Sequence, residues 1–197
     1  MDKIEKIAEL LSLDKDACIE LYSHIPELAE IARHRIIENP FGIDGLFVGS
    51  SGGKDSSVVC HLYATVCKKL NINPLIVHNR KDTVVDSTIL NLYKNSLPVL
   101  YCSPSDIKYF SDRCKIQVDG SRRVEAVRDN GRSTDYVQDG KNVSRTNLEM
   151  YVPNSLFGLN FIYPIFDWSD EAVWMYNLYY KLRVSEEYGE VCYLYNT

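Results

Sequence analysis

A glycine-rich turn between an apolar run and an amphipathic segment constrains the fold of this chain more than any other feature. The apolar run covers residues 45–49 and is short and continuous, as strands buried in a parallel sheet are. The turn, residues 50–53, reads Ser-Ser-Gly-Gly. A buried strand, a tight turn and a helix in this order begin an α/β unit. The helix is predicted from apolar side chains that recur at every fourth position, at Val58, Leu62, Val66 and Leu70.

The residues after this unit continue the alternation of strand and helix. Short apolar strands separated by helices predict an α/β fold, namely a three-layer sandwich whose mainly parallel sheet is covered on both faces. The predicted elements are strands over residues 75–77, 98–101 and 116–118, a helix over 84–95, and a hairpin of 136–138 and 141–143 around an Asp-Gly turn.

Helices are also predicted at both ends of the chain. Pro26 is typical of the first turn of a helix. Ser169 is a typical N-cap residue for the last predicted helix, and a brief tail is expected after that helix. Residues 1–42 are expected to form an N-terminal helical extension and residues 43–197 the main domain, within one compact unit. The three N-terminal helices are predicted over residues 3–12, 15–23 and 26–38.

The composition excludes several classes of function. The 197 residues carry a net charge of −5, which excludes a broadly basic nucleic-acid coat, so nucleic acid is not indicated as a partner. No apolar run approaches the roughly 18 residues of a membrane span, and the N-terminus lacks a signal-peptide core. The six cysteines form no CxxC pair, and Cys60 and Cys67 suit buried helix positions. A cytoplasmic protein is therefore expected.

The turn has the chemistry of an anion site. A loop from a strand end to a helix start directs free backbone N–H groups and the positive helix end toward one point. Gly52 and Gly53 allow close approach of an anion and positive φ angles. Lys54 adds a positive charge, so a phosphate or pyrophosphate is the best ligand. Val48 and Asp55 stand where a Walker A loop has glycine and Ser or Thr, and GxGxxG is absent. Hydroxyl donors are added by Ser51, Ser56 and Ser57.

The sequence Ser-Gly-Gly-Lys-Asp-Ser, residues 51–56, resembles the signature of the PP-loop superfamily, which is adenine nucleotide alpha hydrolase-like. The resemblance implies that ATP is bound with its pyrophosphate in the loop and that its α-phosphate is attacked. It further implies that Asp55 helps to hold Mg²⁺ near the phosphates. Lys54 and the loop amides would then stabilise charge on the departing pyrophosphate.

A second segment carries three arginines within seven residues, and arginine makes bidentate contacts with phosphate oxygens. It has the pattern Gly-x-Arg-Arg-x-Glu-x-x-Arg and is similar to the arginine loop of the PAPS (phosphoadenosine phosphosulfate) reductase and sulfate adenylyltransferase small-subunit family. Glu125 would orient an arginine through a salt bridge. A solvated charged loop is the alternative. The residues concerned are Gly120, Arg122, Arg123 and Arg128.

Two further segments fit the same family. Residues 163–174 resemble its Pro-x-x-x-Trp-Ser segment, in which Pro164 and Trp168 have a packing role. His78 follows the second strand, where relatives hold adenine and ribose, although the usual His-x-Asp-Thr reads His-Asn-Arg here. A nucleotide contact and a purely structural histidine both remain open for His78.

Three classes of function are therefore carried forward. The first is an ATP pyrophosphatase or adenylyltransferase that uses ATP and Mg²⁺. The second is a PAPS reductase, for which Cys192 is the candidate thiol although the flanking Gly-x-His is missing. The third is a non-catalytic nucleotide-binding subunit, with a partner subunit or a second copy. The candidate catalytic residues are Lys54, Asp55, Arg122, Arg123 and Arg128, and the candidate nucleotide contacts are Ser50, Ser51, Gly52, Gly53, Ser56, Ser57, His78 and Gly120.

Overall fold

A computed structural model describes residues 2–79, 99–102, 114–124, 136–138, 141–143, 149–153 and 158–196. Within these ranges the chain has an α/β fold, as the alternating pattern predicts. The helix predicted over 84–95 and the Asp-Gly turn at 139–140 lie outside the described residues, as do Glu125 and Arg128.

A six-stranded mixed sheet forms the centre of the molecule, in the order β3-β2-β1-β4-β8-β7. Four of the pairings are parallel, and β7 pairs with β8 in the antiparallel direction. The strands are β1 (Leu46–Ser50), β2 (Ile76–Asn79), β3 (Val99–Cys102), β4 (Ile116–Val118), β7 (Tyr151–Val152) and β8 (Asn160–Ile162).

The predicted strands are found with small shifts. The second begins one residue later than predicted and extends through His78, which pairs with Ser50 of β1. The predicted hairpin is confirmed as β5 (Tyr136–Gln138) and β6 (Lys141–Val143), an antiparallel pair. The two-residue strand β7 is not foreseen, because so short a stretch carries no periodic signal.

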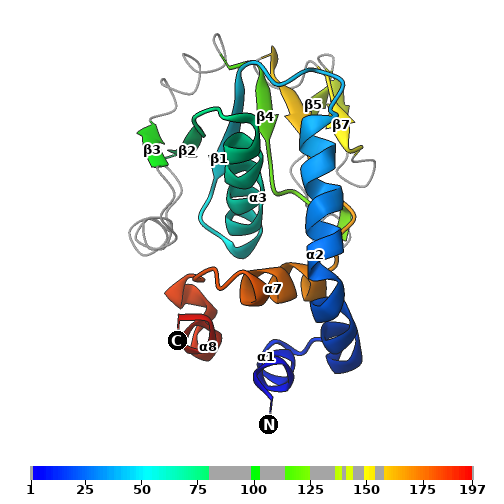
Figure 1. Ribbon diagram of the computed structural model, residues 1–197, viewed down its shortest axis with the longest axis vertical. Coiled ribbons are helices and arrows are strands. Elements are labelled where there is room, and N and C mark those ends of the chain that lie inside the picture. The colour runs from blue at the N-terminus through cyan, green and yellow to red at the C-terminus, as the bar shows by residue number, and fades with distance from the viewer. Residues whose placement is uncertain are drawn as a thin grey trace.

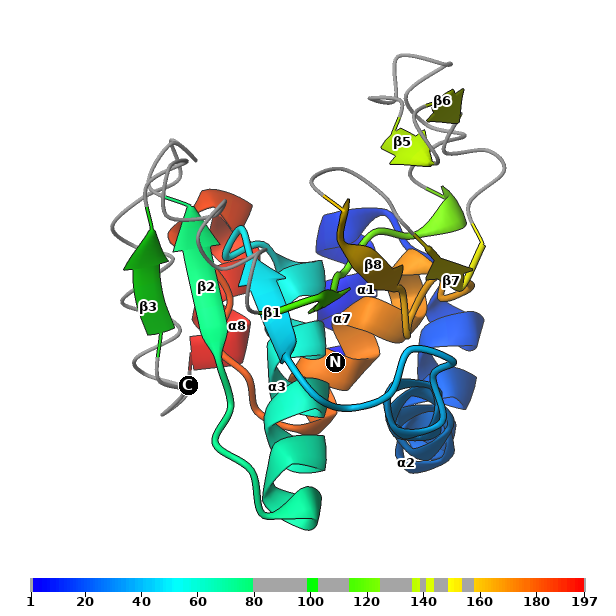
Figure 2. The same cartoon turned by 90° about the horizontal axis from the view of Figure 1, so that it is seen from above.

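Helix α3 (Lys54–Leu70) packs on β1, and helix α2 (Lys15–Ile37) lies beside α3 on the same face of the sheet (Figures 1 and 2). Helix α7 (Asp170–Tyr179) lies below the lower end of α3 in Figure 1 and packs against the lower half of α2. Because β1 runs downward in that view, α7 lies at the edge of the sheet where the parallel strands end. Ligands of parallel α/β sheets bind at this edge.

The N-terminal helices differ from the prediction. After α1 (Lys3–Leu11), α2 runs without a break through Pro26, where the sequence predicts a new helix start. Proline costs a helix one hydrogen bond. A buried stripe on both sides of Pro26 keeps the helix continuous, because it packs against α3 and α7. The stripe consists of Cys18, Ile25, Ala29, Ala32 and Ile36.

The C-terminal part is more structured than a brief tail. Ser169 caps α7 as predicted and accepts a hydrogen bond from the Ala172 N–H at 3.3 Å. Beyond α7 the chain forms the 3₁₀ helix η3 (Glu186–Tyr188) and helix α8 (Glu190–Asn196). Tyr195 anchors α8 through a 2.8 Å hydrogen bond to the Trp174 carbonyl.

The main hydrophobic core lies between the sheet and these helices. It includes Cys60 and Cys67, both fully buried as expected, together with the apolar stripe of α3. Burial raises the pKa of the Cys60 thiol to about 12, so this thiol stays protonated. Among the described residues, no helix is both long and apolar enough to cross a membrane.

Candidate functional site

The glycine-rich turn joins β1 to α3 at the lower edge of the sheet in Figure 1. Gly52 has a φ of +82°, which an L side chain rarely adopts, so glycine is required there. Gly53 precedes the first turn of α3 with φ −68°, an ordinary value. Of the two glycines expected to need positive φ, only Gly52 does. For Gly53 the close approach of a ligand remains as the predicted reason for glycine.

The backbone N–H groups of the turn donate hydrogen bonds to nearby serine hydroxyl groups. The Gly52 N–H donates to Ser50 Oγ at 3.2 Å, and the Gly53 N–H donates to Ser51 Oγ at 3.4 Å. The hydroxyls of Ser51 and Ser56 lie 2.7 Å apart, and Ser56 Oγ also accepts from the Ser51 N–H. The hydrogen bonds donated by Gly52 and Gly53 are weak because their donor–acceptor distances are long. A phosphate oxygen can therefore replace them at small cost.

The Ser57 hydroxyl has a different role in the helix start. It donates to the Gly53 carbonyl at 3.1 Å, one turn back. Ser57 is buried, with 4% of its surface exposed, so it faces the protein. Ser57, one of the predicted nucleotide contacts, thus bonds the backbone of the turn.

Four charged side chains, here called the charge cluster, gather behind the turn: Lys54, Asp55, Arg122 and Asp170. Lys54 Nζ lies 2.6 Å from Asp55 Oδ2 and 3.7 Å from Asp170 Oδ1. Arg122 Nε lies 2.6 Å from Asp55 Oδ1, and Arg122 Nη2 lies 2.7 Å from Asp170 Oδ1. Two cations and two anions thus neutralise each other where α3 and α7 begin.

The two adjacent arginines lie in different environments. Arg122 is completely buried, and besides its ion pairs it donates to the Trp168 carbonyl at 3.2 Å. Arg123 is exposed, and its guanidinium lies 4.9 Å from the ring centre of Phe166. The structure therefore brings Arg122 to the start of α3, behind the glycine-rich turn, from the protein interior, and gives Arg123 an aromatic neighbour.

Gly120 lies against the start of α3. A Cβ atom there would stand 3.1 Å from the Asp55 carbonyl carbon and 3.3 Å from the Ser56 nitrogen. These are backbone atoms of a helix, so they cannot move aside as a flexible side chain could. Gly120 therefore permits the β4 end to pack on α3, which brings Arg122 within reach of Asp55.

His78 is a buried residue of β2 that contacts the end of β1, directly before the glycine-rich turn. Its side chain is 0% exposed, and its Nδ1 lies 2.7 Å from the Ser50 carbonyl oxygen. Since a carbonyl only accepts, Nδ1 is the protonated nitrogen. In this structure His78 supports the end of β1, which favours the structural interpretation over direct nucleotide contact.

Three residues at this site were missed by sequence reasoning. An acidic residue in the first turn of a helix is ordinarily explained by the helix dipole, and Asp170 in α7 also completes the charge cluster. The Tyr188 hydroxyl accepts from the Lys54 N–H at 3.0 Å, and Asn177 Nδ2 donates to the Lys54 carbonyl at 3.3 Å. Asp170 directly follows the cap residue Ser169, a local signal that it shares with its neighbour Glu171. The other two contacts depend on packing between distant segments.

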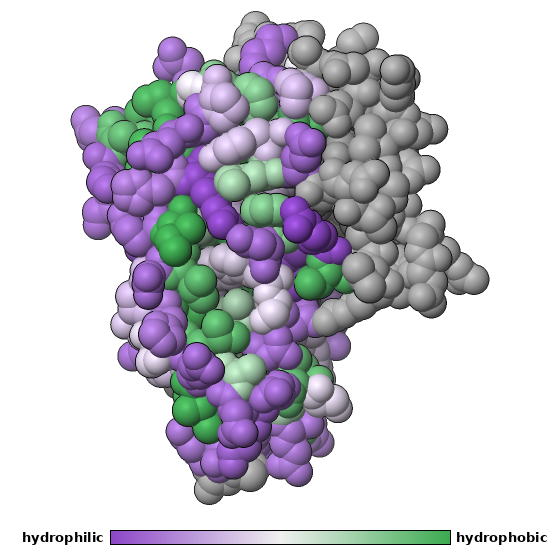
Figure 3. Space-filling view, turned by 90° about the vertical axis from the view of Figure 1, so that its right-hand side faces the viewer, coloured by the Kyte–Doolittle hydropathy of each residue, from purple (hydrophilic) through white to green (hydrophobic). Residues whose placement is uncertain are grey.

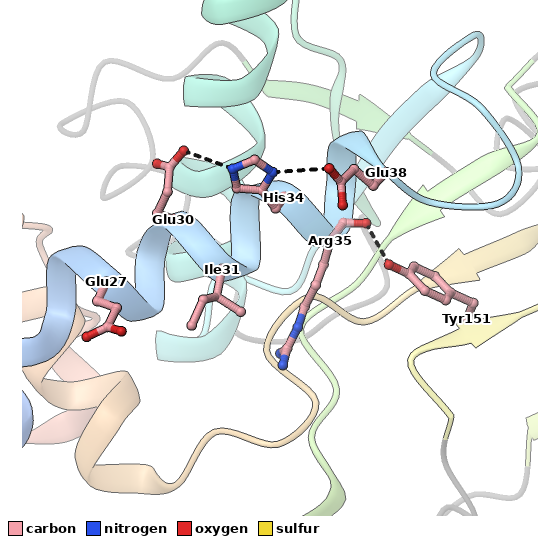
Figure 4. A pocket seen from close by; sticks show the side chains of 7 residues that line it. All are labelled: Glu27, Glu30, Ile31, His34, Arg35, Glu38 and Tyr151. Atoms are coloured by element: carbon pink, nitrogen blue, oxygen red, sulfur yellow. Dashed lines mark hydrogen bonds and ion pairs between the residues drawn. The ribbon is translucent and has the colours of Figure 1, made fainter.

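A hollow of about 460 Å³ on the outer face of α2 is a separate feature. Figure 3 shows this side of the molecule, where hydrophobic side chains alternate with hydrophilic ones. Figure 4 shows His34 between Glu30 and Glu38, at 3.5 Å from each, and Tyr151 bonded to the Arg35 carbonyl at 3.1 Å. Three glutamates line the hollow, so it suits a phosphate ligand poorly.

The residues fit a magnesium ion that arrives with a nucleotide. Asp55 Oδ1 lies 2.6 Å from Arg122 Nε and Oδ2 lies 2.6 Å from Lys54 Nζ, so an ion could reach Oδ2 only if the Lys54 amine moved. One carboxylate oxygen supplemented by phosphate oxygens suits Mg²⁺. Among the described residues, no group of three acidic, cysteine or histidine side chains could hold a metal without a nucleotide.

Comparison of the chain with protein-family models finds no match, and comparison with curated proteins finds none either.

Proposed function

We propose that this protein binds ATP and cleaves it between the α- and β-phosphates, as an ATP pyrophosphatase or adenylyltransferase of the PAPS reductase family. The pyrophosphate lies in the turn from Ser50 to Ser57. The acceptor is an oxyanion such as sulfate, or a sulfur-transfer substrate. The proposal includes the three-layer sandwich of that family. It also includes a cytoplasmic location, for which the free thiols of five cysteines argue, namely Cys18, Cys60, Cys67, Cys114 and Cys192.

One observation carries the proposal: backbone N–H groups and one lysine gather at the start of a long helix. The N–H groups of Gly52, Gly53 and Lys54 are bonded to hydroxyl oxygens, which a phosphate oxygen can replace. Charged acceptors make stronger hydrogen bonds than hydroxyls do. The helix dipole adds to the attraction for an anion.

Three side chains of the charge cluster have a defined part in this function: Lys54, Asp55 and Arg122. When a pyrophosphate enters, Lys54 Nζ turns from Asp55 Oδ2 to the phosphate oxygens. Asp55 remains fixed by Arg122 and presents Oδ2 to the magnesium ion that accompanies the nucleotide. Arg122 is then a positioning residue, whereas Arg123 is exposed and leaves its guanidinium over the Phe166 ring.

The reaction is an in-line displacement at the α-phosphorus. The acceptor oxygen forms a bond to this phosphorus as the bridging oxygen of the β-phosphate leaves with the electron pair. Negative charge accumulates on the departing pyrophosphate, where the loop amides and Lys54 stabilise it. The products are an adenylylated acceptor, or AMP when water attacks, and inorganic pyrophosphate.

The reductase alternative receives less support from the contacts. Its thiol would be Cys192, which is only 4% exposed and belongs to the hydrophobic core. A nucleophilic thiolate needs an accessible and electropositive setting.

The test is product analysis with α-labelled ATP and Mg²⁺, with and without sulfate. The proposal predicts labelled AMP or an adenylylated product together with pyrophosphate. Labelled ADP would contradict it, because cleavage would then lie between the β- and γ-phosphates. Tight ATP binding without turnover would favour a non-catalytic subunit. Turnover of PAPS that is lost in Cys192→Ser would favour the reductase.

A further inference from the structure

Tyr188 makes a hydrogen bond to the end of the glycine-rich turn from a distant segment of the chain. Its hydroxyl oxygen accepts the Lys54 N–H at 3.0 Å across 134 positions of sequence. The same oxygen lies 3.6 Å from the point where a Cβ on Gly53 would stand. The C-terminal segment therefore places a polar oxygen directly at the N-terminus of α3.

This position is the one that a phosphate oxygen needs. The N–H groups of the first helical turn have no partner within the helix, and Lys54 is the first residue of α3. For Gly52 and Gly53 the substitute acceptor is a serine hydroxyl within the turn. For Lys54 the acceptor comes from another element, so its removal requires movement of that element.

The segment that carries Tyr188 is held at both ends. Ser185, before η3, is buried, and its carbonyl accepts the Tyr188 N–H at 3.2 Å. The Tyr188 ring meets Trp174 edge to face at 4.9 Å between centroids. Between these anchors, Glu186 and Glu187 are exposed. Because Glu186 and Glu187 form a short exposed turn, the tyrosine can loosen its contact with Trp174 and move without unfolding α8.

We propose that Tyr188 gates the phosphate loop. Its hydroxyl accepts the hydrogen bond of the Lys54 N–H when no nucleotide is bound, and it is displaced when the polyphosphate of a nucleotide binds. The inference rests on the proposed function. It adds that the Tyr188 hydroxyl and the polyphosphate compete for the Lys54 N–H. The energy of one hydrogen bond, lost on opening, lowers the affinity for the nucleotide.

Titration calorimetry with Mg-ATP tests the gate on the full chain. Tyr188→Phe removes the hydroxyl and keeps the ring on Trp174, so we expect the Kd to fall by about 2- to 10-fold, as one net hydrogen bond allows. Tyr193→Phe is the matched control, because Tyr193 follows in α8 and is 72% exposed. Its Kd should equal that of the wild type. An unchanged or higher Kd for Tyr188→Phe would overturn the gate.

Hydrogen exchange of the wild-type protein gives a second test that needs no variant. Addition of Mg-ATP should accelerate exchange in residues 185–190, while it slows exchange in residues 52–54. Slower or unchanged exchange in 185–190 would overturn the gate. If the wild type binds ATP and only the Tyr188 effects are missing, the gate alone fails. If the wild type binds no ATP, the proposed function fails and the gate falls with it.

Discussion

Arg122 Nε lies 2.6 Å from Asp55 Oδ1, and the whole Arg122 side chain is shielded from solvent. The same guanidinium reaches Asp170 at the start of α7. One buried cation therefore joins two helix starts, and the Asp55 carboxylate is fixed before any ligand arrives. A positioned carboxylate lowers the cost of organising a phosphate site.

Loss of this cation should cost stability. Arg122→Met leaves two carboxylates close together with Lys54 as the one remaining cation of the charge cluster, so we expect the free energy of unfolding to fall by about 3–5 kcal/mol. Urea denaturation measures it. Arg123→Met is the control, since Arg123 is exposed, and it should cost well under about 1 kcal/mol. Equal losses for the two variants would show that Arg122 contributes no more than a surface arginine.

Two glycines of the site should respond differently to alanine. Gly120→Ala puts a Cβ 3.1 Å from the Asp55 carbonyl carbon, so it should destabilise the protein by about 1–3 kcal/mol. Gly53→Ala meets nothing closer than 3.6 Å and has an allowed φ, so the fold should tolerate it. We expect Gly53→Ala to weaken Mg-ATP binding instead, because its methyl group faces the ligand. Thermal melts and calorimetry distinguish these outcomes, and a stable Gly120→Ala would contradict the close packing.

The activity should depend on Lys54 and Asp55. Lys54→Ala and Asp55→Ala are each expected to lower the rate of pyrophosphate release at least about 100-fold, as loss of electrostatic stabilisation does. Asp55→Asn is a useful companion, because it keeps the shape of the side chain while it removes the charge. Urea midpoints identify variants that fail only by unfolding. Wild-type turnover in folded Lys54→Ala would contradict the role given to the amine.

Acid should destabilise the fold through His61, outside the candidate site. Burial lowers the pKa of His61 to about 4 from 6.5, and the charge of Arg33 adds to the effect. The unfolded chain therefore binds the proton first, so stability is complete above pH 6.5 and is lost as the pH falls toward 4.

The matched variant is His61→Gln, which can still bond the Tyr176 hydroxyl, 2.8 Å from His61 Nδ1. Between pH 7 and 4 the wild type should lose up to about 3 kcal/mol more unfolding free energy than His61→Gln. Urea denaturation across this pH range measures the difference. Parallel pH profiles for the two proteins would show that His61 does not titrate in this way.

Local patterns predicted the centre of the site but not its surroundings. The apolar run, the Gly-Gly turn and the stripe from Val58 to Leu70 are sufficient for β1, the loop and α3, because each depends on neighbours in sequence. Ser169 was predicted as a cap for the same reason. Helix α2 was wrongly divided at Pro26, since tertiary packing there outweighs a local preference.

The remaining contacts depend on distances along the chain that no local pattern encodes. Asp170 meets Arg122 across 48 positions, and Tyr188 meets Lys54 across 134. A charged side chain in a helix start is usually explained by the dipole alone. Only the packed structure distinguishes Asp170, which completes a buried cluster, from Glu171, its neighbour in sequence.

Amide chemical shifts test the central claim most directly. In a titration of the ¹⁵N-labelled protein with Mg-ATP, the largest changes should occur at the backbone N–H groups of Gly52, Gly53 and Lys54. The amides of Glu30 and Ile31, beside the hollow on α2, should remain unchanged. Unchanged amides in the glycine-rich turn, or largest changes on α2, would contradict a phosphate site between β1 and α3.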